Sequence, residues 1–337
     1  MSSSPFPDTR IPLIIVTGFL GSGKTSFVNH ILASLTNKKV VVIENEFAEL
    51  GIDSRIIKKS KDSKIFELNN GCICCSMNGE LEGVFAEIVK NKEHWDYVII
   101  ETTGVADPSP IISNFFSNPL LCEEFRLDCM YTLVDCKNFF KQIQREYETK
   151  KQIAFANKIL LNKIDLVEEE EKEKIKKEIS KLNPDSQISE TTHAKIPLQH
   201  IFEESAFDIS DLKKIKNSFQ SFSFSPSLAP SVLTKPVQSH DIQSFGISSE
   251  GEILLPEFDF FIRTLIELKR NDLYRTKGIV NLKGANQPLI FQGIHDAIEW
   301  FPGPPWGEDE KRETKMIFIG KNLDKQDIET AFKKILH

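Results

Sequence analysis

Short apolar runs alternate with amphipathic stretches between residues 11 and 205 of the chain. The runs are rich in β-branched residues, which favour strands, and the stretches between them repeat their apolar positions at helical spacing. The predicted strands are 11–17, 40–44, 97–101, 130–134, 159–162 and 187–190, and the predicted helices are 24–35, 79–91, 137–156 and 168–182. This alternation predicts a mostly parallel sheet with helices on both faces, the doubly wound α/β plan.

The pattern changes near residue 218. Residues 218–238 combine Ser, Phe and Pro with few charges and no helical period, which predicts a linker. Beyond it the pattern predicts strands near 240–248, 274–283, 288–295 and 315–320, a helix over 257–269 and a closing helix from Lys325. We therefore expect an α/β domain at 10–217 and a smaller α+β domain at 239–337 with largely antiparallel pairing.

Composition agrees with two soluble domains in a chain of 337 residues, of which 40% are hydrophobic and 27% charged. The net charge of -7 gives no support for a nucleic-acid-binding surface. The early apolar run is too short to cross a bilayer, and the first residues lack the pattern of a secretory signal. Three of the six cysteines crowd into positions 72–75, which in a reducing cytoplasm indicates metal or redox chemistry.

A glycine-rich segment, Gly-Phe-Leu-Gly-Ser-Gly-Lys-Thr at 18–25, joins the first predicted strand to the first predicted helix. Glycines let successive N–H groups face phosphate oxygens, the helix N-terminus adds partial positive charge, and Lys24 adds a full one. Thr25 supplies a hydroxyl for Mg²⁺. A glycine turn without a ligand would leave the Lys-Thr pair unexplained, so the segment predicts a P-loop. The expected nucleotide-binding residues are Gly18, Gly21, Ser22, Gly23, Lys24, Thr25 and Ser26.

An acidic residue closes the predicted strand 97–101. Glu101 stands where a carboxylate can hold the water shell of Mg²⁺, and Gly104 can donate its N–H to a γ-phosphate. Many buried strands end in an acidic residue, so Glu101 is informative because its strand lies downstream of the P-loop. Lys24, Thr25, Glu101 and Gly104 are the expected catalytic residues.

The string Asn162-Lys163-Ile164-Asp165 follows another predicted strand. A buried Asp165 carboxylate can accept both the N1–H and the exocyclic amine of guanine, and adenine would leave it unpaired. Asn162 would face the opposite edge of the base, and the stem of Lys163 would lie along its plane. The alternative is an ordinary strand end whose aspartate caps the following helix. The string favours GTP over ATP.

Cys72, Cys74 and Cys75 lie ahead of a predicted helix. In extended backbone Cys72 and Cys74 point the same way, and if the helix begins early Cys75 and Glu82 share a face. Either arrangement offers two or three ligands for a divalent transition metal, with a carboxylate completing the set. A redox dithiol and a buried turn of small residues remain alternatives. Cys122, Cys129 and Cys136 are expected in packing, and His193 is retained as an accessory ligand candidate.

Together these motifs resemble the CobW-type GTPases and their YjiA-like branch, in the SIMIBI class of P-loop GTPases. The likeness rests on the Cys-x-Cys-Cys cluster between P-loop and acidic strand, which is that family's signature. The residues that carry it are 17–25, Ile-Glu-Asn-Glu-Phe at 43–47, Gly-Ile-Asp at 51–53, Asn-Gly-Cys-Ile-Cys-Cys at 70–75, Glu-Thr-Thr-Gly-Val-Ala-Asp-Pro at 101–108 and 162–165, with Arg-Thr-Lys-Gly at 275–278, Phe-Gln-Gly at 291–293 and Pro-Trp-Gly at 305–307 in the second domain.

The resemblance implies a GTPase that handles or delivers a transition metal, Zn²⁺ or Co²⁺, to a client metalloprotein. It also implies metal binding at Glu44, Cys74 and Glu82, with Cys72 and Cys75 as partners, and places Asp53 in a nucleotide-responsive segment near Mg²⁺. The implied cofactors are GTP, Mg²⁺ and the transition metal.

We expect slow GTP hydrolysis coupled to metal handling in the cytoplasm, without a nucleic-acid or membrane partner and with a nucleotide- or metal-dependent oligomer. The first alternative is a non-catalytic, nucleotide-sensing metal-binding module. The second is a P-loop kinase for a small metabolite, which the guanine string disfavours.

Overall fold

The computed structural model describes residues 9–35, 38–45, 63–68, 73–91, 95–104, 106–145, 147–197, 201, 242–308 and 310–337. The predicted linker at 218–238, Asp53 and Cys72 lie outside these ranges. The chain divides into two compact units, one of residues 2–180 and 186–208 and the other of residues 181–185 and 209–337 with residue 1. We refer to them as the first unit and the C-terminal unit.

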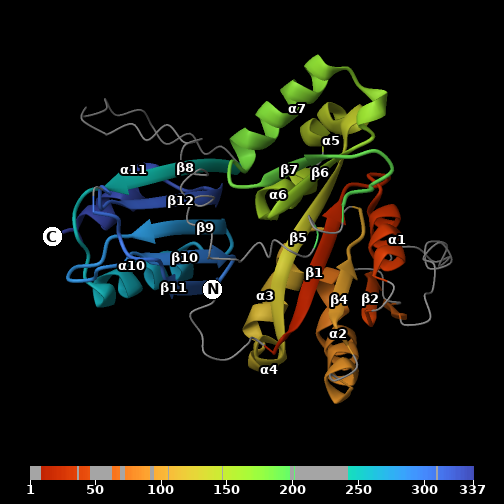
Figure 1. Ribbon diagram of the computed structural model, residues 1–337, viewed down its shortest axis with the longest axis horizontal. Helices are drawn as coiled ribbons and strands as arrows, with labels where there is room; N and C mark the ends of the chain where they lie inside the picture. Colours follow the sequence, from red (N-terminus) through yellow and green to blue (C-terminus); the bar gives the residue numbers. More distant parts are fainter. Residues whose placement is uncertain are drawn as a thin grey trace. The chain divides into compact units, whose positions relative to one another are not determined.

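The described part of the first unit is built on a parallel sheet in the order β3-β2-β4-β1-β5-β6-β7 (Figure 1). Every neighbouring pair in it runs parallel. Its strands are β1 (Ile11–Gly18), β2 (Val40–Asn45), β3 (Ser63–Leu68), β4 (Tyr97–Glu101), β5 (Phe125–Asp135), β6 (Lys158–Asn162) and β7 (Gln187–Glu190). Because β1 is central and the chain turns to opposite sides of it, the carboxyl edge beside β1 is where this kind of sheet binds ligands.

Helices follow most of these strands. They are α1 (Lys24–Ser34), α2 (Ile73–Lys90), α3 (Ser109–Ser117), α4 (Pro119–Glu124), α5 (Phe139–Arg145), α6 (Tyr147–Phe155) and α7 (Glu169–Leu182), with single 3₁₀ turns at Cys136–Asn138 and Ile164–Leu166. None of the helices in the described ranges is long and apolar enough to cross a membrane.

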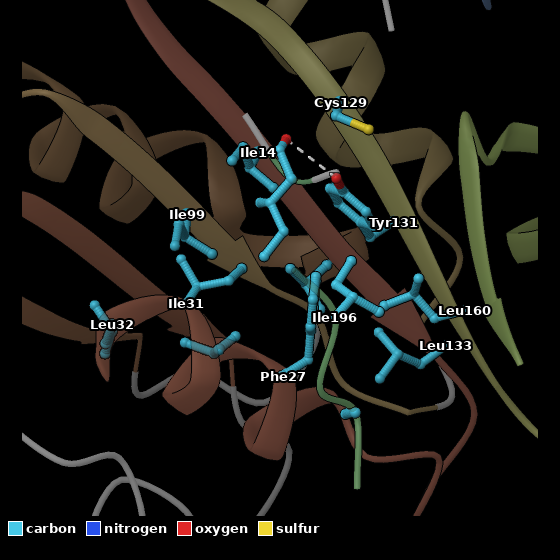
Figure 2. Close-up of a cluster of buried hydrophobic side chains, with 14 of the residues drawn as sticks. Ile14, Phe27, Ile31, Leu32, Ile99, Cys129, Tyr131, Leu133, Leu160 and Ile196 are labelled. Atoms are coloured by element: carbon cyan, nitrogen blue, oxygen red, sulfur yellow. Dashed lines mark hydrogen bonds between the residues drawn. The ribbon is translucent and has the colours of Figure 1, made fainter. Parts of the chain in front are cut away.

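Both faces of the central strand are buried, as the unbroken apolar run 13–16 requires. Ile14 and Val16 belong to a cluster with Phe27 and Ile31 of α1, which covers one face (Figure 2). The intervening residue Ile15 points to the other face and is just as deeply buried. The sheet therefore has helices on both sides, and α1 is fixed directly beneath the carboxyl end of β1.

The C-terminal unit contains an antiparallel sheet in the order β11-β10-β9-β12-β8. Its elements are β8 (Ile242–Ser249), α10 (Leu255–Leu268), β9 (Leu273–Val280), β10 (Leu289–Ile294), β11 (Ala297–Pro302), β12 (Thr314–Lys321) and α11 (Lys325–Lys333). Residues of α10 and α11 share one apolar cluster with Phe291, Met316 and Phe318 of the sheet. Within this unit Arg275 is buried and lies 2.9 Å from a carboxylate oxygen of Asp185.

The predicted fold class, a doubly wound parallel sheet followed by a smaller antiparallel α+β unit, is confirmed. The prediction missed β3, β11, α3 and α4, and it began α2 at 79 rather than at Ile73. Over the predicted helix 137–156 the structure has a 3₁₀ turn at Cys136–Asn138 and helices at Phe139–Arg145 and Tyr147–Phe155, which bury Ile143 and Gln152. Residue 146, between the two helices, lies outside the described residues.

Candidate functional site

The loop between β1 and α1 has a backbone that only glycine adopts readily. Gly18, Gly21 and Gly23 have φ values of +140°, +74° and +105°. A Cβ on Gly18 would lie 2.4 Å from the main-chain oxygen of Leu133, and one on Gly23 would lie 2.4 Å from the side-chain nitrogen of Asn162. Conformation therefore favours glycine at all three positions, and the available space also requires it at Gly18 and Gly23.

The N-terminus of α1 is open for an anion. Its N-cap residue, Gly23, provides no side-chain cap, and its first turn contains no acidic residue. The free N–H groups at a helix start and the positive end of its dipole suit a phosphate group. Lys24 is buried and its Nζ donates to the carbonyl of Phe19 at 3.3 Å, so its ammonium lies inside the loop, while Ser26 is exposed on the first turn.

Thr25 and Glu101 meet although 76 residues separate them in the chain. The Thr25 hydroxyl donates a hydrogen bond of 2.8 Å to Oε1 of Glu101. The contact follows from the pairing of β1 with β4, in which Val16 is the register partner of Glu101. A hydroxyl and a carboxylate side by side at a phosphate loop are a ligand set that Mg²⁺ takes, with phosphate oxygens and waters completing its octahedron. The residues present fit this ion.

Gly104 lies against the P-loop itself. A Cβ on Gly104 would come within 2.5 Å of the main-chain nitrogen and 2.6 Å of the Cα of Leu20. The segment after β4 is thus as close to the loop as two backbones allow. This places the expected γ-phosphate donor beside the expected phosphate cradle.

The side chain of Asn162 is buried and joins two loops. Its Nδ2 donates to the carbonyl of Ser22 at 2.8 Å, and its Oδ1 accepts from the N–H of Ala194 at 2.9 Å. One amide thereby ties the P-loop to the loop that follows β7. Asn162 positions these two loops.

Lys163 and Asp165 follow Asn162 at the same edge of the sheet. Lys163 adopts a left-handed φ of +62°, and its Nζ lies 2.7 Å from Oδ2 of buried Asp135. Asp165 is exposed within the 3₁₀ turn, which corrects the expected burial. It precedes the first residue of α7, Glu169, by a full turn, so the alternative in which it caps that helix does not hold.

Three residues of this edge escaped the sequence prediction. Asp135 holds Lys163, Ala194 holds Asn162, and Gln152 of α6 donates to the carbonyls of Gly104 and Ala106. Asp135 had a sequence signal, because it ends a strand just as Glu101 does. Ala194 and Gln152 gave none, because their contacts depend on packing between distant segments.

Glu44 is the last residue but one of β2 and lies directly beside Glu101. The two glutamates are register partners of the parallel β2–β4 pair, and both are buried. On the other side of β2, Asn45 pairs with Leu68, the last residue of β3. The chain leaves β3 there and enters α2 at Ile73, so topology brings the cysteine motif to the edge of the sheet that carries Glu44.

Cys74 and Cys75 lie in the first turn of α2, as in the alternative with an early helix start. Glu82 is exposed on the same helix, seven residues after Cys75. Seven helical residues rise about 10.5 Å, so the two side chains would have to extend toward each other along the helix to share one ion. Glu82 stays a predicted ligand. Among the side chains that the structure describes, no three His, Cys, Asp or Glu residues gather as a metal site; the cysteine motif falls outside them.

Cys129, Cys136 and His30 make structural contacts, and His193 is exposed. Cys129 and Cys136 are buried, and burial raises the pKa of the Cys136 thiol to about 12, which disfavours the thiolate that a metal needs. His30 of α1 lies 2.6 Å from the carbonyl of Ile196 and so holds the loop after β7. His193 lies in that loop with a φ of +57°.

A glycine-rich phosphate loop, a hydroxyl–carboxylate pair beside it and an Asn-Lys-x-Asp string at the same sheet edge define a P-loop GTPase. Comparison with known proteins agrees with this class. Residues 12–190 match the family model for the CobW/HypB/UreG nucleotide-binding domain, and residues 242–336 match that for the cobalamin synthesis protein cobW C-terminal domain.

Two relatives cover almost the whole chain. The zinc chaperone YjiA of Escherichia coli is 32% identical over 326 residues, 96% of this chain and 98% of the relative. The zinc-regulated GTPase metalloprotein activator 1 of Saccharomyces cerevisiae is 28% identical and covers 97% of this chain and 84% of its own length. The crystal structure of the Zn(II)-bound YjiA GTPase superposes with a TM-score of 0.70 at 27% identity, over 97% of this chain and 99% of that one. The chain belongs to the CobW/HypB/UreG family.

Replacing Gly104 by alanine should reduce the kcat of GTP hydrolysis about a hundredfold, the cost of displacing a donor from a transition-state oxygen. The added Cβ forces the backbone away from Leu20. Steady-state phosphate release measures the effect. Gly83→Ala is the matched control, because nothing lies within 4 Å of its Cβ and alanine favours the helix. Equal turnover in both variants would contradict the assignment.

Proposed function

We propose that this protein binds Mg²⁺–GTP at the P-loop, hydrolyses it slowly, and couples the nucleotide to a transition metal, zinc or cobalt, that it delivers to a client metalloprotein. The observation that carries the proposal is the register that sets Glu44, an implied metal ligand, beside Glu101, which accepts from Thr25 of the P-loop. The names of the relatives, a zinc chaperone and a zinc-regulated GTPase activator, support the same function.

The phosphates bind the N-terminus of α1 and its loop, with Lys24 neutralising their charge. Thr25 and Glu101 hold Mg²⁺, which when bound neutralises charge on the phosphate oxygens. Gly104 donates its N–H to the γ-phosphate and orders the segment after β4 in the GTP state. None of the motifs at 17–25, 101–108 and 162–165 contains an arginine, so stabilisation of the transition state is incomplete and turnover is slow without a partner or metal.

The base lies at the ends of β6 and β7. Exposed Asp165 accepts the two donors of guanine, and binding of the base covers its carboxylate. The Lys163 stem lies along the ring, because Asp135 fixes its ammonium. Asn162 contributes indirectly, by holding the loop residue Ala194 beside the P-loop.

The transition metal is the cargo. Thiolates of Cys72, Cys74 and Cys75 with the carboxylate of Glu44 form a four-ligand set of the kind that zinc and cobalt accept. Glu82, two helical turns further along α2, is the remaining candidate ligand. Asp53 belongs to the segment between β2 and β3 and is proposed to respond to the nucleotide. Free thiolates favour a reducing compartment such as the cytoplasm.

The client is proposed to be an apo-metalloprotein, and the net charge of -7 argues against nucleic acid as a partner. An oligomer that forms with nucleotide or metal is consistent with a switch of this kind. The metal and nucleotide sites themselves need neither a client protein nor an oligomer.

The metal assignment predicts the metal content of protein purified without chelator. The wild-type chain should retain about one zinc or cobalt ion, because three thiolates and a carboxylate close a tetrahedral site. Cys74→Ser should lose most of it. Cys122→Ser is the matched control, since the Cys122 thiol donates to carbonyls of α3 and lies outside the motif. Equal metal content in both variants would remove the cysteine motif from the proposal.

Measurement of GTP turnover distinguishes the proposed GTPase from the rival function, a nucleotide-sensing module without catalysis. Wild-type protein should release phosphate from GTP and not from ATP, and Lys24→Ala should abolish release because the loop loses its full positive charge. A malachite-green assay follows this. Nucleotide binding without any release, in the presence of bound zinc or cobalt, would favour the rival.

A further inference from the structure

Gln152 of α6 is buried completely at the segment that follows β4. Its Nε2 donates to the carbonyl of Ala106 at 3.1 Å and to that of Gly104 at 3.4 Å. Both acceptors are carbonyl oxygens, so the amide nitrogen must face them. Within the part of the chain that is described, Oε1 has no hydrogen-bond partner.

A buried amide whose oxygen has no partner is less favourable in a core than an apolar side chain. A buried polar atom without a partner is destabilising, and an apolar side chain of the same size would avoid that cost. What glutamine offers instead is the pair of donors to the segment after β4. Its presence is therefore explained by the carbonyls that it holds.

The helix that carries Gln152 is itself anchored to the sheet. The Thr132 hydroxyl of β5 donates to the main-chain carbonyl of Gln152 at 2.7 Å. That carbonyl lies in the last turn of α6, where helices leave their C=O groups without internal partners. The amide nitrogen of Gln152 is thus fixed relative to the strand next to β1.

A second contact from the same helix holds the same segment. Lys151 forms an ion pair with Oδ2 of Asp107, and Oδ1 of Asp107 accepts from the N–H of Ser109 at the start of α3. Residues 104, 106 and 107 are therefore bound to α6 from one side, while Leu20 of the P-loop touches Gly104 from the other.

We propose that Gln152 is a positioning residue that sets the peptide of Gly104 for the γ-phosphate. It fixes the carbonyl side of Gly104, Leu20 limits the position of its Cα, and the N–H of Gly104 is thereby restrained before nucleotide binds. A donor placed in advance strengthens binding of the triphosphate and stabilises charge on its oxygens during hydrolysis. Because GDP lacks the γ-phosphate, Gln152 discriminates between the two nucleotides. The inference rests on the proposed GTPase function and adds a residue to it.

The test uses the full-length Gln152→Met variant, which conserves volume and removes both donors. Affinity for a non-hydrolysable GTP analogue with Mg²⁺ should fall about tenfold, the worth of one charge-assisted hydrogen bond, whereas affinity for GDP should stay within about twofold. The kcat should fall at least as much as the analogue affinity. Fluorescent nucleotide titration and steady-state phosphate release measure these quantities.

Thr149→Val is the matched control. Thr149 is buried on the same helix, and its hydroxyl has no hydrogen-bond partner among the described residues. Its loss should leave both affinities and kcat unchanged. If Gln152→Met does not fold, Gln152→Leu serves instead, because its side chain also lacks a hydrogen-bond donor.

A purely structural role would lower the affinities for GDP and for the analogue equally, and that result, or no change in either, would overturn the inference. A wild-type protein that neither binds the analogue nor releases phosphate would instead refute the proposed function. The two failures are distinguishable because one is read from the variant and the other from the unmodified chain.

Discussion

The hydrogen bond from Thr25 to Glu101 is the contact on which the rest of the site depends. It exists because β4 pairs with β1, so the end of one strand meets the helix that begins at the end of the other. A buried carboxylate is costly unless it is bonded, and here its partner belongs to the phosphate loop. The sheet order thus converts two sequence motifs into one phosphate and Mg²⁺ site.

The same register extends the site toward the metal. Glu44 pairs with Glu101, and β3 returns the chain to the edge beside Glu44 before the cysteines enter α2. One row of strand ends therefore carries the candidate ligands of two ions. On the opposite side of β1, Asn162 joins the P-loop to the loop after β7, and Gln152 joins α6 to the segment after β4. The P-loop is therefore connected both to the strand end that carries Glu44 and to the loop that follows β7.

Sequence patterns predicted the elements whose causes are local. The P-loop glycines, the apolar strands and the class of the C-terminal unit all follow from backbone requirements and periodicity. β3 was missed because it is an edge strand whose described side chains, Ile65 and Phe66, are only half-buried. The hydrogen bonds of Asn162 to Ser22 and Ala194 could not be predicted, because they depend on packing between segments far apart in the chain.

The most direct test of coupling between nucleotide and metal is to compare the zinc affinity of the protein with Mg²⁺ and a GTP analogue to its zinc affinity with Mg²⁺–GDP. Calorimetry against a competing chelator gives both values. Coupling through the Glu44–Glu101 register predicts that zinc binds at least about fivefold more tightly in the GTP state, and linkage requires zinc to tighten the analogue by the same factor. Equal zinc affinity in the two nucleotide states would contradict the coupling.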